Sequence, residues 1–164
     1  MIYLGIDNGV SGFYAVLSQQ GEVMAFDPMP TKKTLNYTKA KQWVTRLSFV
    51  RVNDIFYRLK DAKAAIERPM VMPGRFKATI SAIRALEVVE TALEIQEIPY
   101  QFIDSREWQK VLLPKGLEKG ETKKASDEVC RRLFPGIPVK KSGDGDALLI
   151  AEHLRRKENG GIIK

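Results

Sequence analysis

The sequence predicts an α/β fold in which a mixed five-stranded sheet, with three antiparallel strands first, is flanked by helices. Three patterns support this class. The chain begins with short apolar runs separated by turn residues, as hairpin-linked strands do. The run Ala62–Glu67 has the length of a buried strand, and residues 78–95 carry apolar side chains at helical spacing. Helices should therefore pack on the faces of one sheet.

Turn residues divide the first part of the chain into three strands. The expected strands are residues 2–7, 12–17 and 23–26. Asn8-Gly9 and Gln20-Gly21 supply the turns between them, since Asn and Gly adopt the backbone conformations of tight hairpins. Beyond Pro30 the pattern favours a helix near Thr38–Phe49, and its Trp43 should fill the core or a helix–sheet seam.

Strands and helices alternate in the rest of the chain. The expected strands are residues 62–67 and 99–103, and the expected helices are residues 78–95, 123–134 and 146–157. Ser105 is expected to cap a short helix that carries Trp108, itself a core or seam residue. His153 is expected to be a structural or surface residue. No repeat or composition break divides the 164 residues, so we predict one domain, residues 1–164.

Composition excludes several classes of protein. Hydrophobic residues make up 44% of the chain, yet no apolar stretch approaches the roughly 20 residues of a membrane span. The start of the chain lacks the pattern of a signal peptide. Because Cys130 is the single cysteine, an internal disulfide and a cysteine-rich zinc site are excluded. A reducing, cytoplasmic compartment is expected.

The net charge of +7 is unevenly distributed along the chain. From Pro28 to Asn53 there are six Lys or Arg residues and no acidic residue, and from Lys115 to Lys141 there are eight against four acids. Such tracts are often only solvated surface, but they also attract polyanions such as nucleic acids.

Acidic residues stand at the ends of apolar segments that are far apart in the sequence. Asp7 closes the first strand, Glu67 closes the run at 62–67, and Asp144 and Asp146 precede the last helix. A buried carboxylate is costly unless something compensates its charge. Carboxylates gathered around hard divalent cations, which prefer oxygen ligands, would explain the pattern. A nuclease needs both features: carboxylates for metal and cations for phosphate.

These segments resemble the RuvC-like Holliday junction resolvases of the RNase H-like superfamily, particularly the smaller phage-type members. The resemblance covers most of the chain. It rests on Gly5-Ile6-Asp7-Asn8-Gly9, Ile66-Glu67-Arg68-Pro69 and Asp146-Ala147-Leu148-Leu149-Ile150-Ala151, in this order and with a Lys-rich segment before the third.

The resemblance implies an RNase H-like fold and a homodimer that nicks two strands of a four-way DNA junction. It also implies a divalent metal cofactor, magnesium or manganese. Asp7 would be the central ligand of the metal ions, and Glu67 and Asp146 would complete their coordination. Two cations about 4 Å apart can activate a water, hold the scissile phosphate and stabilise the leaving oxygen. Branched DNA would be the partner, no membrane is involved, and the compartment would be the cytoplasm of a bacterium or a phage-infected host cell.

The last motif departs from the family pattern, in which many members place two acids three residues apart. Here Gly143 stands three before Asp146, and the extra acid is Asp144, only two residues away. On one helix these two would point about 200° apart. Either Asp144 lies in a bent turn and reaches the metal site, or it caps the helix and Asp146 serves alone.

The resemblance also indicates residues that would bind DNA. Met70 follows Glu67 by three residues, where relatives carry a side chain that probes the opened junction, and Lys119 and Lys124 match phosphate-contacting lysines, with Lys123 an alternative to Lys124. The full expected set is Met70, Arg75, Phe76, Lys115, Lys119, Lys123, Lys124, Lys32 and Lys33. The apolar loop that begins at Met70 could instead be a hydrophobic cap on the sheet.

Three other functions fit parts of the sequence. Gly5–Gly9 followed by Ser11-Gly12 also resembles the first phosphate loop of actin-like sugar kinases, but those enzymes need two lobes and 164 residues supply one. An RNA-processing nuclease of the same fold is a second alternative, because RNA and DNA phosphates look alike to lysine. The third is a protein that binds branched DNA without cutting it.

Overall fold

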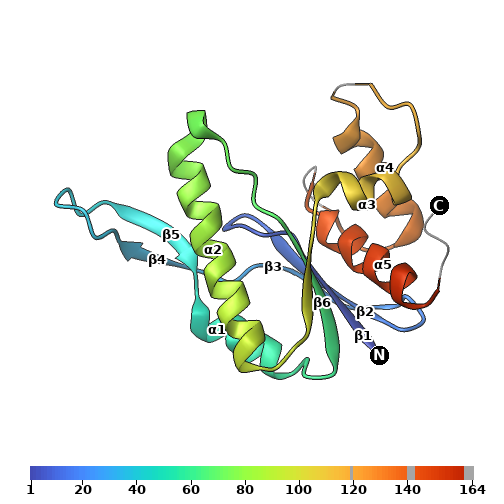
Figure 1. Cartoon of the computed structure of the whole chain (residues 1–164), viewed down its shortest axis with the longest axis horizontal. Coiled ribbons are helices and arrows are strands. Elements are labelled where there is room, and N and C mark those ends of the chain that lie inside the picture. Colours follow the sequence, from blue (N-terminus) through green and yellow to red (C-terminus); the bar gives the residue numbers. More distant parts are fainter. Residues whose placement is uncertain (119, 140–142, 161–164) are drawn as a thin grey trace.

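The computed structural model describes residues 1–118, 120–139 and 143–160. Its centre is a five-stranded sheet in the order β3-β2-β1-β6-β7 (Figure 1). The strands are β1 (Ile2–Ile6), β2 (Phe13–Ser18), β3 (Val23–Pro28), β6 (Ala62–Glu67) and β7 (Tyr100–Ile103). The first three pair antiparallel, whereas β6 runs parallel to β1 and β7 runs parallel to β6. The predicted mixed sheet is confirmed.

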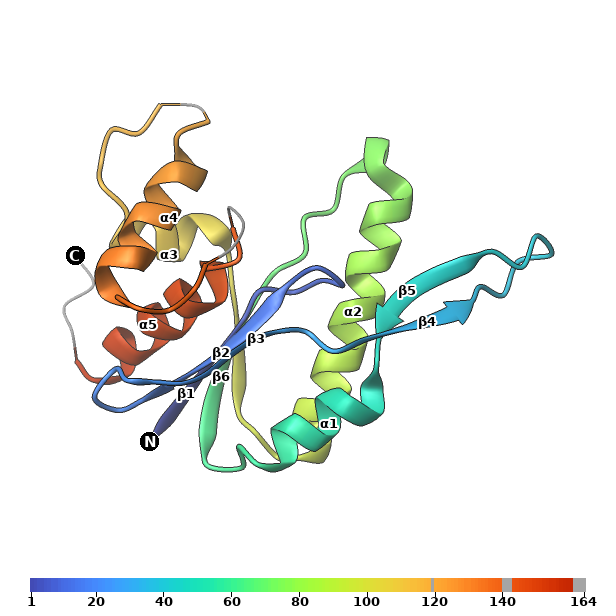
Figure 2. The same ribbon diagram turned by 180° about the vertical axis from the view of Figure 1, so that it is seen from behind.

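Helices cover both faces of the sheet, as Figure 2 shows from behind. One face carries α1 (Phe49–Tyr57) and α2 (Phe76–Ile95), the latter preceded by the short 3-10 helix η1 (Pro73–Arg75). The other face carries α3 (Ser105–Leu112), α4 (Thr122–Leu133) and α5 (Asp146–Glu158). Within the described part of the chain, no helix is long and apolar enough to cross a membrane.

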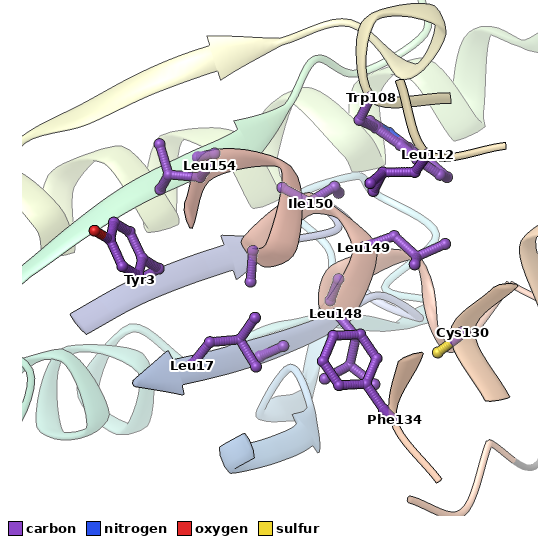
Figure 3. Packing of buried hydrophobic residues seen from close by; sticks show 14 of the residues in the cluster. Tyr3, Leu17, Trp108, Leu112, Cys130, Phe134, Leu148, Leu149, Ile150 and Leu154 are labelled. Carbon is purple, nitrogen blue, oxygen red and sulfur yellow. The ribbon is translucent and has the colours of Figure 1, made fainter. Parts of the chain in front are cut away.

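Side chains along β1 point alternately to the two faces of the sheet, and the core therefore has two layers. Tyr3 faces α5, while Leu4 and Ile6 point to the opposite layer, beneath α2. The α5 layer holds Trp108 and Phe134 among its buried side chains (Figure 3). Burying a large apolar side chain contributes about 1.5–3 kcal/mol, so the two layers fix the positions of both helix groups on the sheet.

Helix α5 lies directly on β1 because a glycine makes room for it. The residues from Ala147 to Leu154 are all buried. A Cβ atom at Gly5 would lie 2.2 Å from the carbonyl oxygen of Ala147 and 2.4 Å from the backbone nitrogen of Ala151. Only glycine permits this approach of helix and strand, which brings the first turn of α5 close to the end of β1.

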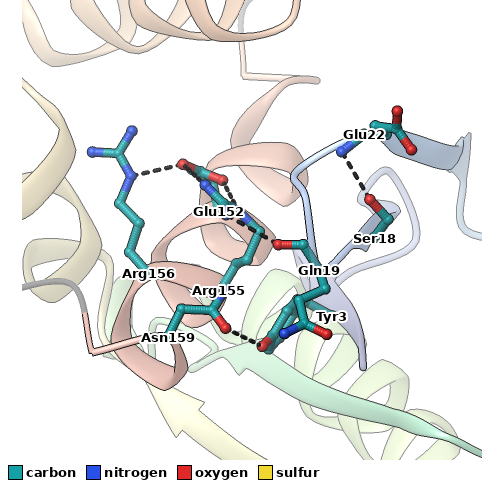
Figure 4. Close-up of polar contacts among 8 residues, drawn as sticks. All are labelled: Tyr3, Ser18, Gln19, Glu22, Glu152, Arg155, Arg156 and Asn159. Carbon is teal, nitrogen blue, oxygen red and sulfur yellow. Dashed lines mark hydrogen bonds and ion pairs between the residues drawn. The ribbon is translucent and has the colours of Figure 1, made fainter.

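The far end of α5 is held by polar contacts (Figure 4). Glu152 accepts hydrogen bonds from the Arg155 guanidinium at 2.7 and 3.0 Å, and Arg155 Nη1 also donates to the carbonyl oxygen of Gln19 at 3.2 Å. The Tyr3 hydroxyl donates to Asn159 Oδ1 at 3.2 Å. These contacts tie the end of α5 to β1 and the β2–β3 turn, so the start of α5 lies at the opposite edge of the sheet.

The helix predicted near Thr38–Phe49 is wrong. Residues 31–47 form a hairpin of β4 (Thr31–Leu35) and β5 (Trp43–Leu47), and α1 begins only at Phe49. Asn36 Oδ1 accepts hydrogen bonds from the Thr38 hydroxyl at 2.8 Å and the Gln42 backbone nitrogen at 3.1 Å. Such local side-chain bonds compete with a helix, and the flanking β-branched residues favour strands.

Three expectations for single residues have different outcomes. Trp108 is fully buried, as predicted, but Trp43 is 69% exposed on the hairpin, so its predicted core position is wrong. Asp104, not Ser105, caps α3, because its side chain forms a capping box with Glu107. His153 is buried in α5, which confirms a structural position.

Candidate active site

Asp7 and Glu67 lie side by side because their strands are parallel neighbours. Ile6 of β1 pairs with Ile66 of β6, and each acid is the next residue along its strand. Both strands end at the same edge of the sheet, so the two carboxyl groups meet there. When protonated, Asp7 donates a hydrogen bond to Glu67.

Asp146 reaches the same edge from the other layer. It is the first residue of α5, which packs on Gly5 two residues before Asp7. The Ser126 hydroxyl of α4 donates to Asp146 Oδ1 at 2.6 Å and holds the carboxylate in place. The site is thus built from two strands and two helices that are remote in sequence.

Asp144 lies in the turn that leads into α5. Gly145 occupies the N-cap position, so Asp144 precedes the helix rather than continuing it. The turn is organised by Asp127, whose Oδ1 accepts from the Gly143 backbone nitrogen at 3.2 Å, and by a 3.1 Å bond from the Asp146 nitrogen to the Gly143 carbonyl oxygen. Gly143 has a φ of 92°, which favours glycine. Asp144 thus lies in the turn before the helix and not at its N-cap, and its role as a metal ligand stays a prediction.

The four acids influence one another electrostatically. The pKa of Asp7 is raised from 3.8 to about 8, mainly by burial and also by the negative charges of Glu67, Asp146 and Asp144 and the hydrogen bond to Glu67. A carboxyl group that stays protonated near neutral pH marks a site with more negative charge than its surroundings compensate. We call Asp7, Glu67, Asp144 and Asp146 the carboxylate cluster.

Three neighbouring side chains oppose these rises in pKa. Burial raises the pKa of Glu67, but Trp108 opposes it by donating a hydrogen bond from Nε1 to Glu67 Oε1 at 3.1 Å. Burial also raises the pKa of Asp146, against the hydrogen bond from Ser126 and the positive charge of Lys123. Both carboxylates are therefore oriented by donors that favour their ionised form.

The cluster opens into a cleft of about 1030 Å³. Asp7, Asp144 and Asp146 line it on one side, strand β3 forms another wall, and Lys123 provides a positive charge. Both Lys123 and Lys124 are exposed on α4, but only Lys123 lines the cleft. Lys119 lies outside the described residues.

None of the other expected DNA-binding residues in the described part of the chain is among the residues that line the cleft. Met70 and Arg75 are exposed between β6 and α2, and Phe76 is exposed at the start of α2, so the hydrophobic-cap alternative does not hold for these side chains. Lys115 is exposed after α3, and Lys32 and Lys33 are exposed on β4. Their contact with DNA stays a prediction.

The donor set fits hard divalent cations, although the side chains do not form a tight cage. Within the described residues, no group of three or more His, Cys, Asp or Glu side chains has the geometry of a preformed metal site. The cluster nevertheless offers only carboxylate oxygens, the ligands that magnesium prefers. The negative charges of Glu67, Asp146 and Asp144 contribute to the raised pKa of Asp7, and a bound cation would offset them.

Sequence analysis missed the residues that support the acids. Ser126 and Asp127 were unremarkable members of a helix, and Trp108 was expected only to fill space. Buried tryptophan usually needs a partner for its indole N–H, and this was a usable signal. Nothing in the sequence identified which acid would accept it.

Comparisons with known proteins establish the fold. No protein-family model and no curated protein sequence matches the chain. Solved structures do match over almost its whole length. One is Thermus thermophilus RuvC in complex with a Holliday junction substrate, with 15% identity and a TM-score of 0.65, covering 98% of both chains. A second structure of Thermus thermophilus RuvC has 16% identity and a TM-score of 0.60, again covering 98% of both chains. The chain has the RNase H-like fold.

Proposed function

We propose that this protein is a metal-dependent endonuclease that resolves four-way DNA junctions and related branched DNA by paired nicks. The observation that carries the proposal is the carboxylate cluster, in which the pKa of Asp7 is raised to about 8 by burial and by its acidic neighbours. A cluster of this kind is costly to fold and is best explained by cation binding. The fold shared with junction-bound Thermus thermophilus RuvC supports the choice of substrate.

In this proposal Asp7 is the ligand shared between two magnesium or manganese ions, and Glu67, Asp146 and Asp144 complete the two coordination spheres. The bound metals would supply an activated water and charge stabilisation for phosphodiester hydrolysis. Trp108 and Ser126 donate hydrogen bonds to Glu67 and Asp146, which favours the ionised form that binds cations. Lys123, at the cleft wall, would attract and position the phosphate backbone.

The test compares a synthetic four-way junction, a linear duplex and an RNA–DNA hybrid as substrates, each with magnesium and with excess EDTA. We expect paired nicks in the junction with magnesium only. Asp7→Asn should keep junction binding but lose cleavage by several orders of magnitude, because a metal ligand is removed while the basic surface remains. Asp27→Asn is the matched control, since Asp27 lines the same cleft but lies outside the carboxylate cluster.

Three outcomes would contradict this proposal. Full cleavage by Asp7→Asn or in EDTA would exclude the metal role of the cluster. Preferred cleavage of the hybrid would favour an RNA-processing nuclease. Junction binding without cleavage by the wild-type protein would favour a binding protein.

We also propose that the protein acts as a symmetric homodimer through α2. A four-way junction has two-fold symmetry, and paired nicks need two active sites related by the same axis. One chain carries one carboxylate cluster. Along α2, Val89 and Leu93 are buried, but Ile83 is 40% and Ile95 is 56% exposed, so apolar surface remains for a partner.

Sedimentation with and without junction DNA tests the dimer. Ile83→Glu should produce folded monomers that no longer make symmetric nicks, because a charge in an apolar interface is not compensated. Thr91→Glu adds the same charge at an exposed position of the same helix and is the control. A wild-type protein that stays monomeric, both free and on DNA, would refute the homodimer.

A further inference from the structure

The hairpin that replaced the expected helix forms a positively charged arm beside α2. We use "the arm" for residues 31–47, which begin and end next to α2 and point away from it in both views (Figure 1, Figure 2). The arm carries five Lys or Arg residues and no acid: Lys32, Lys33, Lys39, Lys41 and Arg46. The Asn36 side chain accepts hydrogen bonds from Thr38 and Gln42 and so stabilises the turn at the tip of the arm.

A groove of about 570 Å³ separates the arm from α2. Arg46 lines it from the arm, and Lys77 and Arg84 line it from α2, with no acidic side chain among its described lining residues. The Arg84 guanidinium lies 5.3 Å from the centre of the Tyr37 ring, which is 81% exposed at the tip of the arm. The groove thus combines cations with an accessible aromatic face.

Two features of Arg46 indicate that the groove is built for an anion. Lys32 lies directly opposite Arg46 in the β4–β5 register, and like charges at paired positions destabilise a hairpin. The buried Arg46 Nε also has no hydrogen-bond partner among the described residues. A phosphate group in the groove would offset the repulsion between these two positive charges.

One loop, residues 7–12, lies between the groove and the candidate active site. Asp7 and Ser11 line the cleft, while Val10 of the same loop lines the groove. Asn8 Nδ2 donates to the Ala82 carbonyl oxygen of α2 at 3.1 Å and fixes this loop between the two. A strand that leaves the cleft over the loop would enter the groove.

We propose that the groove between the arm and α2 binds a single-stranded segment of DNA, with Arg46, Lys77 and Arg84 on phosphates and Tyr37 stacked on a base. Cations combined with exposed aromatic rings are the features of single-strand binding surfaces, because bases in a duplex cannot reach the rings. Two arms would repel each other, which disfavours arm-to-arm pairing in a dimer. The inference rests on the proposed nuclease function, for which it supplies a path for an unpaired strand.

The test measures the anisotropy of a dye-labelled oligothymidylate and of a duplex of equal length, in EDTA, over a series of salt concentrations. Lys77→Ala/Arg84→Ala should weaken oligothymidylate binding about 10-fold and lower the salt slope by about 1.4, since each single-strand phosphate contact contributes about 0.7. Tyr37→Ala should weaken it at least about 5-fold with an unchanged salt slope, because stacking releases no counterions. Arg58→Ala/Lys60→Ala removes two exposed cations at the opposite edge of the sheet and should change binding less than about 2-fold.

Oligothymidylate affinity and salt slope that are unchanged in Lys77→Ala/Arg84→Ala would overturn the inference, as would a larger loss for the duplex than for the single strand. Dissociation of a dimer by the same variant, with DNA binding intact, would make the groove a protein interface and overturn it too. Junction cleavage with magnesium is measured in parallel. If the wild type cleaves junctions and Lys77→Ala/Arg84→Ala binds oligothymidylate normally, only the groove inference is contradicted. If this variant loses oligothymidylate binding but the wild type does not cleave, only the proposed nuclease function is contradicted.

Discussion

Replacing Asp7 by Asn should make the metal-free protein more stable at alkaline pH. The pKa of Asp7 rises from 3.8 to about 8 on folding, so the folded state holds its proton more tightly than the unfolded state does. The stability of the wild-type protein therefore falls as pH rises from about 4 to 8, and the loss is complete above the folded pKa. Asparagine carries no charge and escapes this loss, while its amide can still donate to Glu67.

The magnitude follows from the shift in pKa. Each pKa unit corresponds to about 1.36 kcal/mol, so the shift of Asp7 sets an upper limit of about 6 kcal/mol. Glu67 and Asp146 still repel each other in the variant, and water relaxes around them, so we expect a gain of about 2–4 kcal/mol at pH 9. For a chain of this size this means a melting temperature higher by about 4–16 °C.

Thermal melting at pH 5 and pH 9 in EDTA measures the effect, with Asp27→Asn as the control. The gain should be much smaller at pH 5, where Asp7 is protonated in the folded protein. Magnesium at 100 times its dissociation constant should then stabilise the wild type by about 2.7 kcal/mol and the variant by less. A destabilised variant at pH 9, or an equal gain at both pH values, would refute the reasoning.

Three further changes test the surroundings of the cluster. Trp108→Phe removes the donor to Glu67 and should raise the pKa of that carboxyl and the magnesium needed for cleavage; an unchanged magnesium titration would exclude the positioning role. Gly5→Ala should cost about 3 kcal/mol or more in unfolding free energy, because its Cβ would strike the backbone of α5, whereas Gly74→Ala, with open space around it, should be nearly neutral in the same melting experiment. Asp144→Asn should raise the metal requirement of cleavage, but less than Asp146→Asn does, and equal activity at limiting magnesium would leave Asp144 without a metal role.

The sheet was predictable from sequence because each of its strands has a local signature. The turn pair Asn8-Gly9 separates β1 from β2, and the short apolar run of β6 is followed by Pro69 and Pro73. The arm was missed because Tyr37 and Trp43 are exposed on a hairpin with little core of its own. The apolar residues of this segment resemble one face of a helix. The hydrogen bonds of Asn36, which stabilise the turn of the hairpin instead, are not evident from the sequence.

The acids of the site were predictable because a charged residue at the end of an apolar run is locally conspicuous. Their supports were not, because Trp108 meets Glu67 across 41 residues and Ser126 meets Asp146 across 20. Such contacts depend on how α3, α4 and α5 pack, which no sequence period encodes. The position of Asp144 likewise required the turn held by Asp127.

The two tryptophans of the chain lie in opposite surroundings, and this makes each a separate optical reporter. The Trp108 indole is fully buried and bonded to Glu67, so its emission responds to the electric field of that carboxylate. Trp43, exposed on the arm, emits from a solvated environment that quenchers reach. Trp43→Phe would leave the buried Trp108, beside the candidate metal site, as the single tryptophan. Cation binding could then be followed by a change in its emission, without substrate or label.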